Sequence, residues 1–412
     1  MPETPRILFS PKDSPFINSG YGIITRHLVP RLASHYGKDN ILVFAPVFQR
    51  DEVRDWDGVS ILPGLGATFG EDVIYEHYVH QKCNILLQVG DWSPLRAISQ
   101  LASENKILWV QYAPMDFLNF PQWAFDLLRY AHKIVPFTKQ AEKAFKSYKL
   151  QNVSEAIWIG LDTELWKPLD RKEYPNTMRS LGFTEDSYNL LIVAANQSRK
   201  YLRETLEGIQ HFVQAYPQAN TKVYFHTHVA GERRLDMDVQ ELGLQDIVSF
   251  PDPYNLVLGG IDEPQLVVVF NCADLVLDVT MEGFGMSQTQ AQSCGVPVVC
   301  MSEGGGPELV KWGIEVPSYS IDRSQPLLKP VPHPAQIATG IETMYLAYRE
   351  GKRRSDSVSA WARENFSWDV IAEQWIKLID QVMEERESSC LYIPKPSEEL
   401  LEKSRHIMEV SS

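Results

Sequence analysis

The stretch Met281–Val299, MEGFGMSQTQAQSCGVPVV, reads as a glycine-punctuated turn, a short helix and an apolar strand. An apolar run, ADLVLDV, precedes it, so a strand is expected to lead into the turn. Gly283 and Gly285 free the backbone there, a helix is expected to begin at about Met286, and Gly295 is expected to end it. Backbone N–H groups at a helix start lack partners within the helix and attract anions. The stretch therefore predicts an anion site at a strand-to-helix turn.

Two polar side chains of this stretch are candidates for ligand contact. Glu282 stands just before the helix and can accept hydrogen bonds from sugar hydroxyls. Gln290 follows Met286 by one helical turn and is expected on the same face. The alternative is an ordinary turn and helix with an incidental acid.

A second turn, VAANQSRKYLRETL, places Arg199 and Lys200 where a strand has ended and a helix is expected to begin. Two cations are unfavourable at the positive end of a helix unless an anion binds there. This position favours a clamp for a diphosphate. The alternative is a pair of solvated surface charges.

Two further turns have the same strand-to-helix form. FINSGYGIITRHL has Gly20 and Gly22 immediately before an amphipathic run, where bare backbone N–H groups can approach an anion, although a plain tight turn fits equally well. CMSEGGGPELVK has three glycines after a strand, and Glu308 at the start of the next helix. Together the four turns predict a ligand site at the carboxyl ends of parallel strands.

The alternation of apolar and amphipathic runs predicts two doubly wound α/β domains in the 412 residues. The polar segment LDTELWKPLDRKEYPNTMRSLGF separates them, and FSWDVIAEQWIKLIDQVMEE has a helical apolar stripe. The expected boundaries are residues 1–172 for the first domain, 173–185 for a linker, 186–366 for the second domain, 367–385 for a closing helix and 386–412 for a polar tail.

The composition, 44% hydrophobic and 22% charged, is typical of a globular protein, and neither a membrane span nor a secretory signal is recognised. A cytoplasmic location is expected. The five cysteines show no CxxC pair and are expected to be reduced and buried. The net charge of -14 disfavours nucleic acid and anionic lipid as partners.

Three segments resemble a known family. IGLDTELWKP, FNCADLVLDVTMEGFGMSQTQAQSCGVPVVCMSEGGGPELV and FSWDVIAEQW occur in the order found in the retaining GT-B glycosyltransferases of family four, and the resemblance covers roughly residues 5–383. It implies the α/β GT-B fold, in which two Rossmann-like domains face a cleft and a C-terminal helix crosses back to the N-terminal, acceptor-side domain. The second domain would bind a nucleotide diphosphate sugar, with UDP- or GDP-sugars favoured.

The resemblance also implies roles for individual residues. Glu282 matches the first glutamate of the E-x7-E motif, which contacts hydroxyls of the transferred sugar. Lys200 matches the lysine on the diphosphate. The family's arginine is absent, because Ala195 or Asn196 stands there, and Arg199 is expected to supply its charge. The implied donor-binding set is completed by Gly20, Gly22, Asn196, Gly283, Phe284, Gly285, Met286, Ser287 and Gln290.

Two positions depart from the family pattern. Gln290 replaces the second glutamate, which usually holds the ribose hydroxyls, so weaker or altered nucleotide binding is expected. The histidine that many members have near the reacting sugar is missing. Asp116 is the nearest polar candidate to face the acceptor or the sugar, or else it caps the following helix, DFLNFPQWAFDLL.

The implied reaction is a metal-independent, retaining hexosyl transfer to an acceptor hydroxyl, with Glu282, Lys200, Arg199 and Asp116 as catalytic candidates. No cofactor is expected. Asp236 and Asp238 are metal-ligand candidates by spacing, but a solvated helix face is the favoured interpretation. His226 and His228 are expected to be ordinary loop histidines, because no carboxylate lies near them in the sequence.

The rival functions are a catalytically impaired nucleotide-sugar-binding protein and a phosphorylase or epimerase of the same architecture. The acceptor, whether glycan, lipid-linked or small, and the oligomeric state are left open by the sequence. A modified nucleic acid is the less favoured acceptor.

Overall fold

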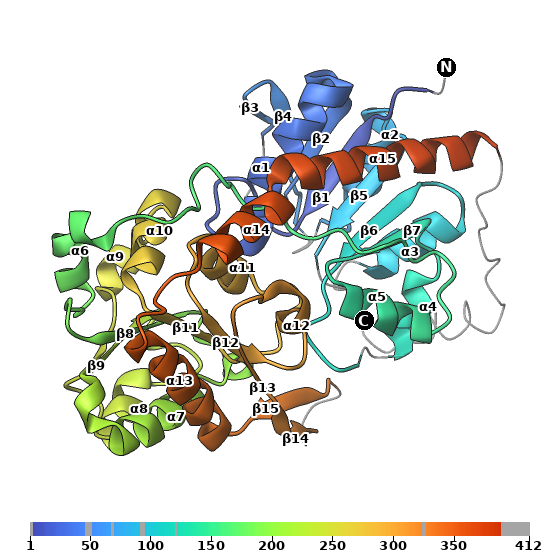
Figure 1. The fold of residues 1–412 in the computed structure, drawn as a ribbon. Coiled ribbons are helices and arrows are strands. Elements are labelled where there is room, and N and C mark those ends of the chain that lie inside the picture. Colours follow the sequence, from blue (N-terminus) through green and yellow to red (C-terminus); the bar gives the residue numbers. More distant parts are fainter. Residues whose placement is uncertain are drawn as a thin grey trace.

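The computed structural model describes residues 3–45, 52–66, 70–90, 95–119, 122–323 and 327–388. Within these ranges the chain forms two α/β units, each with a central sheet and flanking helices (Figure 1). The prediction of two doubly wound units is confirmed.

The first sheet has seven strands in the order β3-β4-β2-β1-β5-β6-β7. All neighbours pair in parallel except β3 and β4, which form an antiparallel edge hairpin that the sequence pattern did not predict. Its elements are β1 (Ile7–Pro11), α1 (Gly20–Tyr36), η1 (Lys38–Asn40), β2 (Ile41–Phe44), β3 (Arg54–Trp56), β4 (Val59–Leu62), α2 (Ile74–His80), β5 (Ile85–Val89), α3 (Leu95–Ser103), β6 (Trp109–Ala113), α4 (Gln122–Leu128), β7 (Lys133–Pro136) and α5 (Lys139–Ser147).

The second sheet has six parallel strands in the order β10-β9-β8-β11-β12-β13. The turns with the candidate residues follow β8, β11 and β12, which are neighbours. The elements are β8 (Tyr188–Val193), η3 (Ser198–Lys200), α7 (Leu202–Ala215), η4 (Pro217–Ala219), β9 (Thr221–His226), α8 (Leu235–Glu241), β10 (Val248–Ser249), α9 (Pro253–Val257), α10 (Glu263–Cys272), β11 (Leu275–Asp278), α11 (Met286–Ser293), β12 (Val298–Met301), α12 (Gly306–Leu309), β13 (Gly313–Val316) and α13 (Pro334–Arg349).

Two pieces of structure lie outside these sheets. The segment between the units contains η2 (Arg171–Glu173) and the short helix α6 (Pro175–Ser180), which packs on α10. A separate antiparallel hairpin, β14 (Ser318–Asp322) and β15 (Lys329–Pro332), follows β13 and was not predicted. Strand β14, SYSID, is mostly exposed, and β15, KPVP, contains two prolines, so neither has the sustained apolar pattern that marks a core strand.

The closing helix returns to the first unit, as the family resemblance implied. Helix α14 (Asp356–Phe366) is followed by α15 (Trp368–Glu387), which lies along the N-terminal unit (Figure 1). The Tyr36 hydroxyl donates to the Ile376 carbonyl at 3.2 Å and to Asp380 at 2.9 Å, and Lys133 pairs with Glu385 at 3.0 Å. These contacts fix α15 on the first domain.

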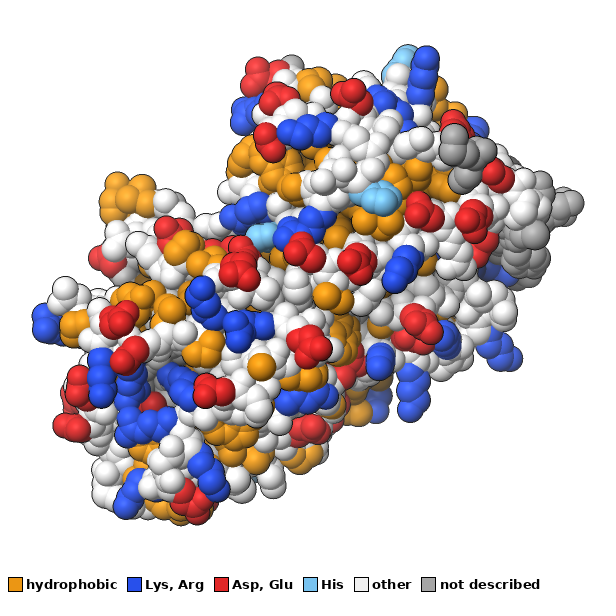
Figure 2. All heavy atoms as spheres, turned by 45° about the horizontal axis from the view of Figure 1, so that its top comes forward, with side chains coloured by type: hydrophobic (Ala, Val, Ile, Leu, Met, Phe, Trp, Pro, Cys, Tyr) orange, Lys and Arg blue, Asp and Glu red, His pale blue; other side chains and the backbone are white. Residues whose placement is uncertain are grey.

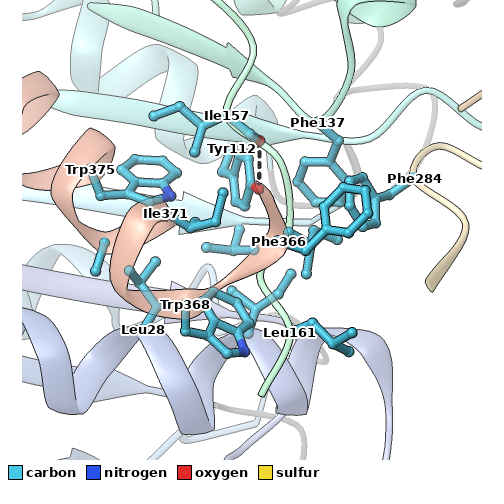
Figure 3. Close-up of a cluster of buried hydrophobic side chains, with 14 of the residues drawn as sticks. Leu28, Tyr112, Phe137, Ile157, Leu161, Phe284, Phe366, Trp368, Ile371 and Trp375 are labelled. Atoms are coloured by element: carbon cyan, nitrogen blue, oxygen red, sulfur yellow. Dashed lines mark hydrogen bonds between the residues drawn. The ribbon is translucent and has the colours of Figure 1, made fainter. Parts of the chain in front are cut away.

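The junction of α14 and α15 sits in an apolar cluster that joins the two units (Figure 3). Trp368 and Trp375 of α15 lie with Tyr112 of β6, and Phe366 contacts Phe284 from the turn after β11. Gly160 has to be glycine, because a Cβ there would lie 2.3 Å from the Trp368 ring. Through Phe284, the turn after β11 is therefore packed into the apolar cluster between the two domains.

The buried thiols agree with the sequence expectation. Cys83, Cys272, Cys294 and Cys300 are buried and free, whereas Cys390 lies outside the described residues. On the face drawn in Figure 2, basic and acidic side chains are intermixed.

Candidate functional site

The turn between β11 and α11 has the predicted backbone. Helix α11 begins at Met286, and Gly285 precedes it with a φ of 86°. Such a left-handed residue is best served by glycine. The helix start has no side-chain cap, so its N–H groups point to the turn without a competing side-chain acceptor. Gly295 ends the helix with a φ of 71°, as predicted.

The carboxylate of Glu282 is held by groups on both sides of the turn. Lys200 donates to Glu282 Oε1 in a close ion pair, and Thr280 Oγ1 lies 2.8 Å from the same oxygen. Thr280 also contacts Asp278 Oδ1 at 3.1 Å, and Ser287 donates to Asp278 Oδ2 at 2.5 Å. Asp278 thus accepts hydrogen bonds from both ends of the turn and holds them together. The roles of Asp278 and Thr280 were not predicted from the sequence, although a carboxylate near the end of the run ADLVLDV was a signal.

Lys200 is a buried cation with 7% of its surface exposed. It ends η3, and Tyr201 then adopts a left-handed φ of 48° before α7 begins. Burial, followed by the charge of Arg199, lowers the pKa of Lys200 to about 8, while Asp278 and Asp116 act in the opposite direction. The contact with Glu282 further favours the charged amine. A buried lysine so placed has its charge available only to groups in this site.

Arg199 lies between two carboxylates from different turns. Its Nη1 is 3.9 Å from Glu282 Oε2 and 3.9 Å from Asp116 Oδ2. The same nitrogen is buried and makes no hydrogen bond within the described part of the chain. The structure therefore brings Arg199, Lys200 and Glu282 together, as expected, and leaves one guanidinium nitrogen without a hydrogen-bond acceptor there.

Asp116 reaches the site from the other domain. It follows β6, and its Oδ1 accepts a hydrogen bond from the Gly283 N–H at 2.7 Å. Helix α4 begins only at Gln122, six positions later, so the structure places Asp116 in the domain junction and not at that helix start.

The glycines of the first turn lie inside a helix and not before it. Helix α1 begins at Gly20, and Ser19 caps it by accepting from the Gly22 N–H at 3.0 Å. A Cβ on Gly22 would lie 2.1 Å from the Ile17 carbonyl oxygen, and one on Gly20 would lie 3.2 Å from Met286 Sδ. Gly22 thus allows close packing of its own loop, while Gly20 lies beside the start of α11.

Several predicted donor-binding side chains have partners within the protein. The Asn196 amide donates to the carbonyls of His228, Val229 and Arg233 and accepts from the Arg233 N–H. Ser287 is bonded to Asp278, and Phe284 is buried in the interdomain cluster. These side chains shape the turns from within.

Gln290 lies in α11 and is 5% exposed. Among the described residues its side chain has no hydrogen-bond partner, yet its polar atoms are not fully enclosed. The amide therefore remains available for a ligand that reaches it.

Glu308 stands in α12 at the fourth turn and contacts the first domain. Its carboxylate accepts from the N–H groups of Lys139 and Gln140 at 3.1 and 3.3 Å, and from Trp158 Nε1 at 2.7 Å. Lys139 and Gln140 begin α5, so a side chain of the second domain binds a helix start of the first. Spacing along the chain gave no signal for a partner that far away.

The groups weighed as metal ligands do not form a metal site. No cluster of three or more His, Cys, Asp or Glu side chains suited to a metal occurs in the described ranges. The reading of Asp238 as a solvated face is wrong: the side chain is buried and paired with Arg203 and Arg233, each at 2.9 Å. Asp236 pairs with Arg234 on the exposed side.

Comparison with solved structures defines the architecture as GT-B. Sucrose-phosphate synthase from Thermosynechococcus elongatus superposes with a TM-score of 0.72 and 16% identity, over 92% of this chain and 99% of that one. Anabaena HepE in complex with UDP-glucose gives a TM-score of 0.69 and 17% identity, over 91% and 99%. At this identity the likeness concerns the fold.

Residues 199–345 match the family model Glycosyl transferases group 1. The chain is 28% identical over 216 residues to D-inositol 3-phosphate glycosyltransferase of Geodermatophilus obscurus, which is 50% of this chain and 43% of that protein. The same enzyme of Paenarthrobacter aurescens gives 26% over 229 residues, or 52% and 48%. The chain thus spans less than half the length of these relatives. Among the described residues no helix is long and apolar enough to cross a membrane.

Proposed function

We propose that this protein transfers a hexose-type sugar from a nucleotide diphosphate sugar to an acceptor hydroxyl, with retention of the anomeric configuration and without a metal ion. The observation that carries the proposal is the contact of Lys200 and Arg199 with Glu282 beside the start of α11. The two cations contact the carboxylate proposed to bind the sugar, and that carboxylate lies just before the uncapped start of α11.

The proposed mechanism assigns charge stabilisation to the clamp. As the bond between the anomeric carbon and the diphosphate oxygen breaks, its electron pair leaves with the diphosphate. Arg199, Lys200 and the N–H groups at the start of α11 would stabilise that negative charge where it develops. The acceptor oxygen forms the new bond on the same face, and its proton passes to the departing diphosphate oxygen. Two side-chain cations supply the positive charge that other transferases take from a metal.

Glu282 has two roles in this proposal. Before the donor binds, it compensates the charge of buried Lys200. When the diphosphate takes over Lys200, the carboxylate is released to accept hydrogen bonds from hydroxyls of the sugar. Binding the donor thus exchanges one internal ion pair for two ligand contacts.

A donor panel tests the function. UDP-glucose, GDP-mannose and an ADP-sugar are titrated into the protein, and each binding donor is then incubated with candidate acceptors while nucleotide diphosphate release and the product anomer are measured. UDP-glucose comes first, because it is the ligand in the HepE structure of similar fold. Binding followed by acceptor-dependent transfer with retention is the expected result. Absence of binding for every donor contradicts the proposal.

A non-catalytic nucleotide-sugar-binding protein is the second candidate, favoured by Asp116 and Gln290 at the two positions that depart from the family pattern. Donor binding without transfer or hydrolysis distinguishes it. We place either function in the cytoplasm, in keeping with the composition and with the free buried cysteines.

A further inference from the structure

Asp116 contacts Arg199, which the proposed function assigns to the donor diphosphate, and Gly283, which the family resemblance places in the donor-binding set. Its Oδ1 accepts from the Gly283 N–H at 2.7 Å, and its Oδ2 lies 3.9 Å from Arg199 Nη1. A backbone N–H in a strand-to-helix turn and a guanidinium are groups that bind phosphate oxygens. A carboxylate offers them the same negatively charged acceptors.

We propose that Asp116 occupies part of the donor diphosphate site in the ligand-free protein and must leave it when the donor binds. The inference rests on the proposed function, because it identifies the partners of Asp116 with the diphosphate site. Asp116 is then an autoinhibitory group, supplied by the acceptor-side domain and acting on the donor-side domain.

The segment from Pro114 to Asp116 packs closely against Gly283. A Cβ on Gly283 would lie 2.4 Å from Asp116 Oδ1 and 3.0 Å from both the Met115 N–H nitrogen and Pro114 Cβ. The segment from Pro114 to Asp116 is thus seated directly on the turn. A phosphate oxygen can reach the Gly283 N–H only after this segment has moved away.

The same segment is held a second time by the second domain. The Leu118 N–H donates to the Leu328 carbonyl at 3.0 Å, and the Leu328 N–H donates to Asn119 Oδ1 at 2.6 Å. Leu328 immediately precedes β15. Displacement of Asp116 therefore works against these hairpin contacts, and the donor-competent state is populated only in part. A ligand that needs a partly populated state binds with an affinity reduced by that fraction.

The test measures the affinity of inorganic pyrophosphate and of UDP, GDP and ADP by calorimetry for the wild type, Asp116→Asn and Asp116→Ala. Asp116→Asn removes the competing charge and should tighten binding about threefold. Asp116→Ala removes the whole competing group and should tighten binding about tenfold, which corresponds to roughly 1.4 kcal/mol. Asp126→Asn, on α4 and away from Gly283, is the matched control and should leave the affinity unchanged. Thermal melting checks that each variant is folded.

Unchanged or weaker binding in both Asp116 variants overturns the inference, because the carboxylate would then be neutral to the ligand or would assist it. In that case binding to the wild type, lost in Lys200→Ala, still supports the proposed function. If none of the four ligands binds the wild type or either Asp116 variant, the proposed function fails and the inference fails with it.

Discussion

The two domains contribute unlike chemistry to one site. The second domain brings Arg199, Lys200, Glu282 and an uncapped helix start, all within turns that follow neighbouring strands. The first domain brings a helix start that is already capped by Ser19, together with the carboxylate of Asp116. One side brings two cations and an uncapped helix start, whereas the other presents a negative charge to them.

The turn after β11 in the second domain is braced by contacts within a short stretch of its own chain, whereas the first domain's contacts with it depend on the packing of the two domains against each other. Asp278, Thr280 and Ser287 brace the donor-side turn within nine residues of the chain. The contacts of Asp116 and Glu308 exist only because the domains meet. Substitutions on the donor side should therefore change binding and catalysis most, and substitutions at the junction should change stability and the balance of domain states.

The largest effect is expected for Lys200→Ala. It removes the buried cation of the proposed clamp, so kcat/KM should fall about 100-fold or more, as for loss of a charge-stabilising donor in a transition state. Lys222→Ala removes a partly exposed lysine of the same domain that donates to the Asp246 carbonyl; it is the control and should retain activity. Equal activity in the two variants would contradict the clamp.

Glu282→Gln should have the next largest effect. The amide keeps the shape but loses the charge that favours hydrogen bonds from the sugar and compensates Lys200, so kcat/KM should fall about tenfold. Steady-state kinetics with Glu373→Gln, an exposed position on α15, provides the comparison. A Glu282→Gln enzyme as active as that control would remove Glu282 from the sugar site.

The pKa of Lys200 predicts a pH dependence. Because burial and Arg199 lower this pKa to about 8, the free protein loses the Lys200 charge as the pH rises through that value. The kcat/KM profile should then fall above about pH 8, since it reports the free enzyme. In Lys200→Arg the guanidinium stays charged, so its fall should shift to higher pH. If kcat/KM fell at the same pH in the wild type and in Lys200→Arg, the titrating group would be a residue other than Lys200.

Glu308→Gln tests the junction. The carboxylate binds two N–H groups at the start of α5 and the indole of Trp158, so its loss of charge should lower the free energy of unfolding by about 1 kcal/mol. Chemical denaturation gives the change, with Glu315→Gln on β13 as a control. Donor affinity should change less than in Glu282→Gln, and the reverse order would place Glu308 in the donor site.

The smallest effect is expected for Gln290→Glu. If the Gln290 side chain meets ribose hydroxyls, a carboxylate there should tighten donor binding about threefold, because charge-assisted hydrogen bonds are stronger. Calorimetry compares the variant with Gln240→Glu, at an exposed position of α8. Gln292→Glu is unsuitable as a control, because the Gln292 side chain is buried and hydrogen-bonded within the core. Weaker binding in Gln290→Glu would mean that the amide meets a different group.

Much of the donor side could be predicted from the sequence because its determinants are local. Apolar runs fixed β8, β11 and β12, Gly285 and Gly295 marked the limits of α11, and the cations fell in the turn between β8 and α7. The edge pair β3–β4 and the hairpin β14–β15 were missed because their strands are short and partly polar. The partners of Asp116, Asn196 and Glu308 could not be predicted, since hydrogen bonds between distant segments leave no spacing pattern in the chain.

Titration of UDP-glucose and GDP-mannose into the wild type and into the double variant Arg199→Ala, Lys200→Ala tests the central claim most directly. The account predicts saturable binding of at least one donor to the wild type, and a loss of about 100-fold or more in affinity in the folded double variant, because both cations of the clamp are gone. Equal affinity in the two proteins would show that the diphosphate binds elsewhere and would contradict the account.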